Sequence, residues 1–115
     1  MLKLVIAFVP VEKTDAILEA VRKIGATGAT VFHQVRGEGL KASKTFLGVG
    51  FTPVRDAIAL VTAESKAREI LECIQDIGDF DDKPGSGIAI QIAVEDAVGL
   101  KTQLPFILRS MEEDT

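Results

Sequence analysis

Few residues of this 115-residue chain have the types and spacing that chemistry at a site requires. His33 is the single histidine and Cys73 the single cysteine, so an internal disulfide and a cysteine-cluster zinc site are excluded. The sequence contains no nucleophile elbow, HExxH, paired-acid or CxxC pattern. We therefore interpret His33 as a structural residue and Cys73 as a buried, inert thiol, and we expect no enzymatic activity.

Two adjoining polar stretches have compositions that could bind ions. Residues 84–87 read Pro-Gly-Ser-Gly, a turn in which successive backbone N–H groups can cradle an anion, although such a turn more often only connects a helix to a strand. Asp79, Asp81 and Asp82 precede this turn and could bind a hard cation. Their spacing lacks the ending of an EF-hand loop, and acids in such a pattern are more often solvated surface.

The segment 37–53 is longer than a tight hairpin loop and is rich in glycine. Lys41 and Lys44 make its centre basic. We expect a mobile functional loop over about residues 38–52 that presents Lys41, Lys44 and Phe46 to a partner.

An alternative for the same segment is a β-ribbon that extends the two flanking strands. Leu47, Val49 and Phe51 alternate with other residues as a strand requires. A ribbon base with a mobile tip would combine the two structures, and the sequence leaves both open.

The elements around these residues follow from hydrophobic periodicity. Period-2 or continuous apolar runs predict strands, and apolar residues at helical spacing predict two helices that end at Gly25 and Gly78, with a left-handed C-cap expected at Gly25. The predicted elements are a strand over 2–9, a helix through 17–24, strands over 29–36 and 57–61, a helix through 67–77 and a strand over 87–93. The order β-α-β-β-α-β predicts a ferredoxin-like α+β fold, a four-stranded antiparallel sheet with both helices on one face.

The two helices match each other when the chain is slid by 53 positions, which brings Gly25 onto Gly78 and Ile17 onto Ile70. The match indicates an internal repeat of the strand–helix unit. Any two amphipathic helices share an apolar stripe, however, and that similarity alone is the alternative explanation.

The strands predicted at 2–9 and 88–94 are apolar on both faces, although the two helices can cover only one face of the sheet. In the first strand Leu2, Leu4, Ile6 and Phe8 share one face. A second subunit is the simplest cover for the other face, and we expect a homotrimer.

Composition limits the other classes of partner. Thirteen Lys and Arg residues against seventeen Asp and Glu give a net charge of -4, and the chain has no Trp or Tyr, so no nucleic-acid surface is expected. The length predicts one domain. The opening apolar run 2–9 is too short to span a bilayer and carries no cleavage-site pattern, so we expect a cytoplasmic protein.

The segments 24–31, 35–39 and 85–88 together resemble the PII family of nitrogen-regulatory signalling proteins, in its divergent PII-like branch. The resemblance covers most of residues 1–100, which are expected to form the domain, and leaves 101–115 as a C-terminal extension. It implies a homotrimer that holds an adenine nucleotide or a related effector in clefts between subunits. It also implies a T-loop at about 38–52 that regulates a transporter or an enzyme, and a B-loop at about 79–87.

Residue by residue, the resemblance carries over a set of nucleotide-binding positions. They are Thr27, Gly28, Thr30, Gly37, Gly39, Lys41, Gly85, Ser86, Gly87 and Lys101. The first three match the segment that lines the cleft from a neighbouring subunit.

Several positions depart from the family pattern. Ile88 stands where the B-loop lysine is expected, Leu40 stands near the position of the T-loop-base arginine, and the T-loop has no tyrosine to modify. We therefore expect AMP or ADP rather than tight ATP binding, and no prosthetic group. The alternative function is a small metal- or anion-binding ferredoxin-like protein, or a structural trimer that binds no nucleotide.

Overall fold

The alternation of apolar residues along the first strand determines which of its sides is buried. The computed structural model describes residues 1–36, 45–46, 49–50, 54–82, 87–100, 102 and 105. In β1 (Leu2–Pro10) the side chains of Val5, Ala7 and Val9 are completely buried, whereas Phe8 is exposed. Successive residues of a strand point to opposite faces, so β1 presents one face to the core and its Leu2-to-Phe8 face away from it.

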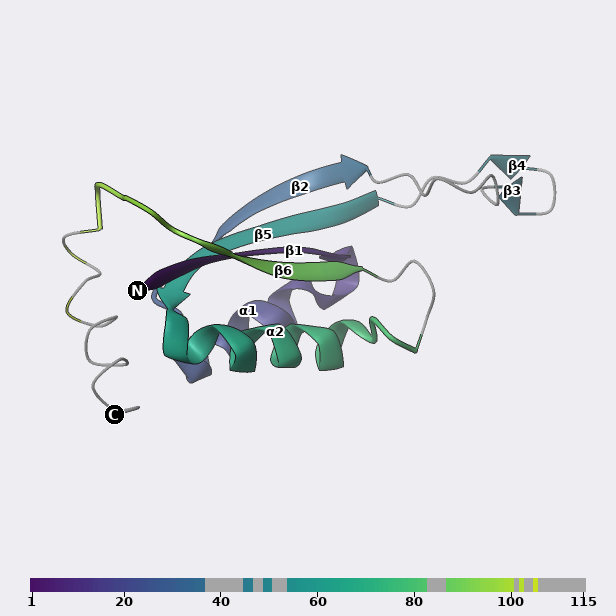
Figure 1. Cartoon of the computed structure of the whole chain (residues 1–115). Coiled ribbons are helices and arrows are strands. Elements are labelled where there is room, and N and C mark those ends of the chain that lie inside the picture. Colours follow the sequence, from purple (N-terminus) through teal and green to yellow (C-terminus); the bar gives the residue numbers. More distant parts are fainter. Residues whose placement is uncertain are drawn as a thin grey trace.

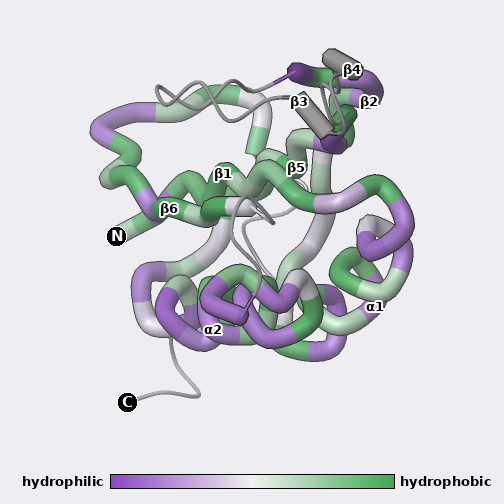
Figure 2. The backbone as a smooth tube through the Cα atoms, turned by 90° about the vertical axis from the view of Figure 1, so that its right-hand side faces the viewer, coloured by the Kyte–Doolittle hydropathy of each residue, from purple (hydrophilic) through white to green (hydrophobic). Residues whose placement is uncertain are grey.

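Six longer elements build the fold, with the same order that the sequence predicts. After β1 come the short 3-10 turn η1 (Val11–Lys13), α1 (Thr14–Ile24), β2 (Thr30–Arg36), β5 (Val54–Ala63), α2 (Glu64–Gly78) and β6 (Ile88–Ala93). The strands form a four-stranded sheet in the order β2-β5-β1-β6, and every pairing is antiparallel. Both helices lie on the same side of this sheet (Figures 1 and 2). The ferredoxin-like fold is therefore confirmed.

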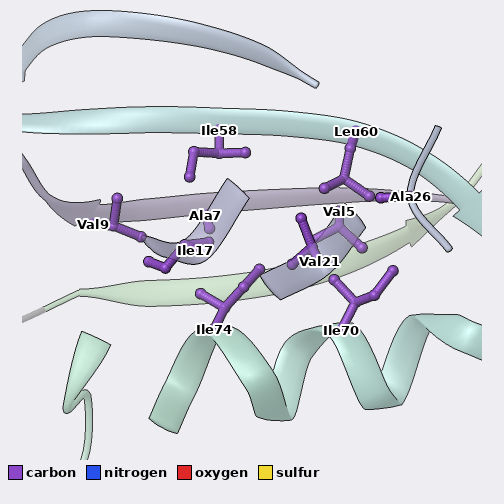
Figure 3. Packing of buried hydrophobic residues seen from close by; sticks show 10 residues of the cluster. All are labelled: Val5, Ala7, Val9, Ile17, Val21, Ala26, Ile58, Leu60, Ile70 and Ile74. Atoms are coloured by element: carbon purple, nitrogen blue, oxygen red, sulfur yellow. The ribbon is translucent and has the colours of Figure 1, made fainter. Parts of the chain in front are cut away.

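The core lies between the helices and the inner face of the sheet (Figure 3). Ile17 and Val21 of α1 and Ile70 and Ile74 of α2 recur at helical spacing and are fully buried or nearly so. They pack against the buried side chains of β1 and against Ile58 and Leu60 of β5 (Figure 3). Burial of these stripes is what stabilises two helices that would be marginal alone.

The two helices end in different ways. Gly25 follows α1 with a φ of 133°, and its N–H bonds to the Val21 and Arg22 carbonyls, so the predicted C-cap is confirmed. Gly78 is the last residue of α2, but the left-handed residue is Asp79, with a φ of 55°. A methyl group at Gly78 would collide with the ring of Phe80, so this glycine is needed for packing.

The segment between β2 and β5 contains a second, very short ladder. Residues of β3 (Thr45–Phe46) pair with β4 (Val49–Gly50), Thr45 opposite Gly50 and Phe46 opposite Val49. A short piece of β-ribbon is thus present, which is consistent with the β-ribbon alternative for this segment. Whether it continues the flanking strands concerns residues outside the described ones.

None of the helices in the described part of the chain is both long enough and apolar enough to cross a membrane.

Candidate functional site

The segments expected to form the T-loop and the B-loop leave the sheet at the same end. The last residue of β2, Arg36, is paired with Val54 at the start of β5, and Ile88 at the start of β6 is opposite Phe8 near the end of β1. Phe80, which follows α2, packs against Gly87 and therefore lies at this end as well. The fold therefore places the boundaries of these two segments, which are far apart in sequence, at one end of the sheet.

The predicted cleft residues that precede β2 are not at this end. Thr27 and Gly28 lie between α1 and β2, beside the opposite end of the sheet, and Thr30 begins β2 opposite Ala59. Gly87 precedes β6, at the other edge of the sheet. Three inter-strand spacings of about 4.8 Å separate these edges by about 14 Å. One chain therefore does not bring Thr27, Gly28 and Thr30 together with Gly87.

The described ends of the B-loop are held by one aromatic ring. Phe80 packs against Gly78 and Gly87, the residues that close α2 and open β6. Gly87 has a φ of 153°, and a methyl group there would collide with the carbonyl oxygen of Phe8 as well as with the Phe80 ring. Only glycine fits at this point, so the predicted B-loop glycine is required by the fold itself.

The acids of the same loop are engaged with neighbouring side chains. Asp79 lies 4.0 Å from the ammonium of Lys13, and Asp81 accepts a hydrogen bond from the side-chain amide of Gln75. The N–H of Asp82 bonds to the carbonyl of Asp79, which makes the turn compact. These contacts offset part of the repulsion among the three acids.

A shallow polar depression of about 280 Å³ lies where α2, the B-loop and β6 meet. Among the described residues that line it, Arg68 is the one cation and forms an ion pair with Glu72 at 3.0 Å, and Asp81 adds another acid. The described lining residues would thus present more negative than positive charge to an anionic ligand.

Most of the other predicted site residues lie outside the described residues. These are Gly37, Gly39, Lys41, Lys44, Gly85, Ser86 and Lys101. The backbone of Phe46 belongs to β3. The roles assigned to these residues stay predictions.

A buried carboxylate near the T-loop base escaped the sequence analysis. Asp56 is only 2% exposed; it accepts a hydrogen bond of 2.6 Å from the hydroxyl of Thr14, and its other oxygen lies 3.0 Å from Nδ1 of His33. The Thr14 hydrogen bond is the main cause of a lowered pKa for Asp56; His33 adds to this effect, and burial opposes it. The signal in the sequence was an acid directly before the apolar run 57–61.

The partner of His33 is Asp56 on the neighbouring strand β5, a contact that agrees with a structural role for this histidine. No local sequence motif around His33 contains this carboxylate. Cys73 is half-buried, and burial, with Asp76 and Glu69 nearby, raises the pKa of its thiol. A thiol with a raised pKa carries little reactive thiolate, in agreement with an inert residue. Among the described residues, no three His, Cys, Asp or Glu side chains gather as a metal site would require.

The outer face of the sheet is strongly apolar. Phe32 is 55% exposed, Ile88 58%, Ile90 42% and Ile92 45%, and Phe8 lies among them. The register places Ile90 opposite Ile6 and Ile88 opposite Phe8, so these side chains share one surface. Figure 2 shows that both helices lie on the other side of the sheet.

Comparisons with known proteins agree with this architecture. Periplasmic divalent cation tolerance protein CutA from Archaeoglobus fulgidus shares 17% identity with the chain at a TM-score of 0.68, over 96% of this chain and 98% of that one. Divalent ion tolerance protein CutA1 from Ehrlichia chaffeensis shares 15% identity at a TM-score of 0.70, over 95% of this chain and 94% of that one. At such identities these similarities establish the fold alone.

No curated protein sequence matches the chain significantly. The sequence profile of the family named nitrogen regulatory protein P-II, in contrast, matches residues 2–103. This match covers the whole sheet and both helices, and it includes the segments on which the resemblance was based. The chain therefore belongs to the nitrogen regulatory protein P-II family.

Proposed function

We propose that this protein is a non-enzymatic, self-associating signal-transduction protein. It senses an adenine nucleotide or a related small effector in clefts between its subunits and regulates a partner, such as a transporter or an enzyme, through residues 38–52. The observation that carries this proposal is the match to the P-II family over residues 2–103. The arrangement of the T-loop and B-loop segments at one end of the sheet supports it.

Self-association, as a homotrimer, is supported by the outer face of the sheet. An exposed surface that contains Phe8, Phe32, Ile88, Ile90 and Ile92 is more apolar than an isolated soluble domain normally tolerates. Burial of about 25 cal/mol per Å² of apolar surface would favour a closed assembly in which these faces meet.

The positions of the predicted cleft residues also favour a site between subunits. Thr27 and Gly28 lie at one end of the sheet, and Gly87 lies at the other end and on the opposite edge. A ligand that contacts both groups can do so only if two copies of the chain contribute to its site.

The bound nucleotide is expected to carry few phosphates. Ile88 occupies the position of the family's B-loop lysine, and the depression beside it contains Arg68 already paired with Glu72. A missing charge-assisted hydrogen bond of about 1.5–3 kcal/mol lowers affinity roughly ten- to a hundredfold. AMP and ADP are thereby favoured over ATP.

Isothermal titration calorimetry with AMP, ADP and ATP, without and with Mg²⁺, tests the proposal. We expect AMP or ADP to bind and metal-free ATP to bind more weakly than either. The Ile88→Lys variant, compared at a concentration at which light scattering gives the wild-type assembly, should strengthen ATP binding at least tenfold, whereas Ile88→Gln, which adds polarity without charge, should not. If none of the three nucleotides binds at millimolar concentration, nucleotide sensing is refuted.

A second candidate function is the binding of a divalent cation. It is favoured by the names of the two structural neighbours, which describe divalent cation or ion tolerance. The contacts of Asp79 with Lys13 and of Asp81 with Gln75 weigh against it, because they occupy the acids most suited to a cation. Thermal unfolding with Cu²⁺, Zn²⁺, Mg²⁺ and Ca²⁺ separates the two functions, since a ligand of the folded state raises the unfolding temperature.

A further inference from the structure

The strand β2, which leads to the T-loop, contains a β-bulge that the hydrophobic periodicity of the sequence did not predict. Phe32 is opposite Ala57 and Val35 is opposite Arg55, so two residues of β2, His33 and Gln34, face the single residue Asp56 of β5. Gln34 has a φ of 61°, which is uncommon for a residue other than glycine. An extra residue of this kind bends its strand and increases the local twist.

The bulge is tied to the interior through Asp56. One oxygen of this carboxylate accepts the Thr14 hydroxyl at 2.6 Å, and the other lies 3.0 Å from Nδ1 of His33. Because Thr14 begins α1 and His33 belongs to β2, the carboxylate links a helix and an edge strand to β5. A buried carboxylate that loses such a partner is strongly destabilised, so the link favours a single arrangement of the bulge.

We propose that His33 and Asp56 form a proton-sensitive latch that holds the bulge of β2 and thereby the direction in which the chain leaves this strand at Arg36. With a neutral imidazole, Nδ1–H donates to the carboxylate. A second proton, taken up at Nε2, converts this contact into an ion pair, and such charge-assisted bonds are roughly twice as strong as neutral ones. The His33 side chain is 74% exposed, so the proton can come from solvent without opening the core.

No other charged group among the described neighbours of His33 and Asp56 competes with Asp56 for the imidazole. Thr14, the contact from α1, is uncharged, and Arg55 precedes Asp56 in β5 and therefore projects from the opposite face of the sheet. Lys13 of η1 is engaged in the ion pair with the acidic turn after α2. Asp56 is thus the ionised group that the described residues place against the imidazole of His33.

The latch does not depend on the effector or on the partner proposed above. It makes the exit of β2 more rigid in mild acid than at alkaline pH, whatever binds elsewhere. Its failure would leave nucleotide binding untouched, and calorimetry with AMP or ADP would still decide that question separately.

Nuclear magnetic resonance of the ¹⁵N-labelled full chain tests the latch, and His33, as the single histidine, gives unambiguous imidazole signals. We expect the Nδ1–H tautomer at alkaline pH. From mildly alkaline to mildly acidic solution, hydrogen-exchange protection of the Phe32, His33 and Val35 amides should rise by up to about fivefold after correction for intrinsic rates. Amides at the β1–β6 pairing, such as Ile6 and Ile90, report any global change and should not follow.

The decisive variant is His33→Gln, whose amide can donate to Asp56 but gains no proton in this range. We expect its bulge amides to show no such rise. An equal rise in this variant, no rise in the wild type, or an Nε2–H tautomer in the wild type overturns the proposal. Asp56→Asn should abolish the tautomer preference; if it does not fold, the wild type and His33→Gln decide alone.

Discussion

Asp56 illustrates at the scale of single residues how a charge can be both buried and stabilising. Its pKa is lowered chiefly by the Thr14 hydrogen bond, so the ionised form favours the folded state. This contribution is fully present above the ordinary carboxyl pKa of 3.8 and is lost as the pH falls through the lower value of the folded protein. Acid below about pH 4 should therefore weaken the link between α1, β2 and β5, whereas mild acid leaves Asp56 ionised.

The variant Asp56→Asn tests the direction of this pH dependence of stability. At neutral pH we expect the variant to lose about 1–3 kcal/mol of unfolding free energy, because the amide can accept at only one of the two positions where the carboxylate oxygens meet Thr14 and His33. The difference from the wild type should shrink only as the pH falls below about 4, where the carboxylate begins to be protonated, in denaturant titrations. Glu69→Gln, on the exposed side of α2, is the control and should show no comparable difference. A pH-independent difference would contradict the role given to ionisation.

A second prediction for a single residue concerns Gly87. Its φ of 153° and the nearby carbonyl of Phe8 exclude a methyl group, so Gly87→Ala should cost about 2–3 kcal/mol or more in chemical denaturation. Gly28→Ala is the matched control, because nothing lies within 4 Å of the added methyl group there. Equal stability of the two variants would mean that the end of the B-loop adapts freely.

At the scale of elements, α2 is held by its buried stripe and hardly at all by its exposed ion pairs. Ile70 is fully buried, whereas Arg68 and Glu72 pair on the exposed side of the same helix at 3.0 Å. Ile70→Ala should therefore destabilise the protein by about 3 kcal/mol, through lost burial and the cavity left behind. Arg68→Ala should cost about 0.5 kcal/mol or less. Thermal and denaturant unfolding of both variants measures the contrast, and similar losses would contradict it.

At the scale of the whole molecule, the proposed homotrimer depends on the outer face of the sheet. Ile90 lies midway along the edge strand β6, opposite Ile6, and is 42% exposed in the single chain, so Ile90→Asp should leave the fold intact. An unpaired carboxylate buried between subunits costs several kcal/mol, and the variant should dissociate. Light scattering should give about three chain masses for the wild type and one for the variant.

Val98→Asp is the control for this experiment, since Val98 is 95% exposed and lies beyond β6. It should assemble as the wild type does. A wild-type protein that stays monomeric at all concentrations would refute the assembly and, with it, a site shared between subunits.

Local patterns in the sequence were sufficient for the elements and for the fold. The alternation in β1, the helical stripes ending at Gly25 and Gly78 and the order of elements predicted the ferredoxin-like arrangement, because periodicity and glycine positions are local properties. The open apolar face also followed from the sequence, since the two predicted helices can cover only one face of the four-stranded sheet.

Only the tertiary structure revealed what depends on contacts between distant residues. The bulge at His33 and Gln34 and the burial of Asp56 follow from register across two strands and from a helix that starts at Thr14, 42 residues before its partner. The separation of Thr27 and Gly28 from Gly87 likewise follows from the strand order β2-β5-β1-β6. Hydrophobic periodicity determines which face of an element is buried, whereas pairing and register determine which side chains meet.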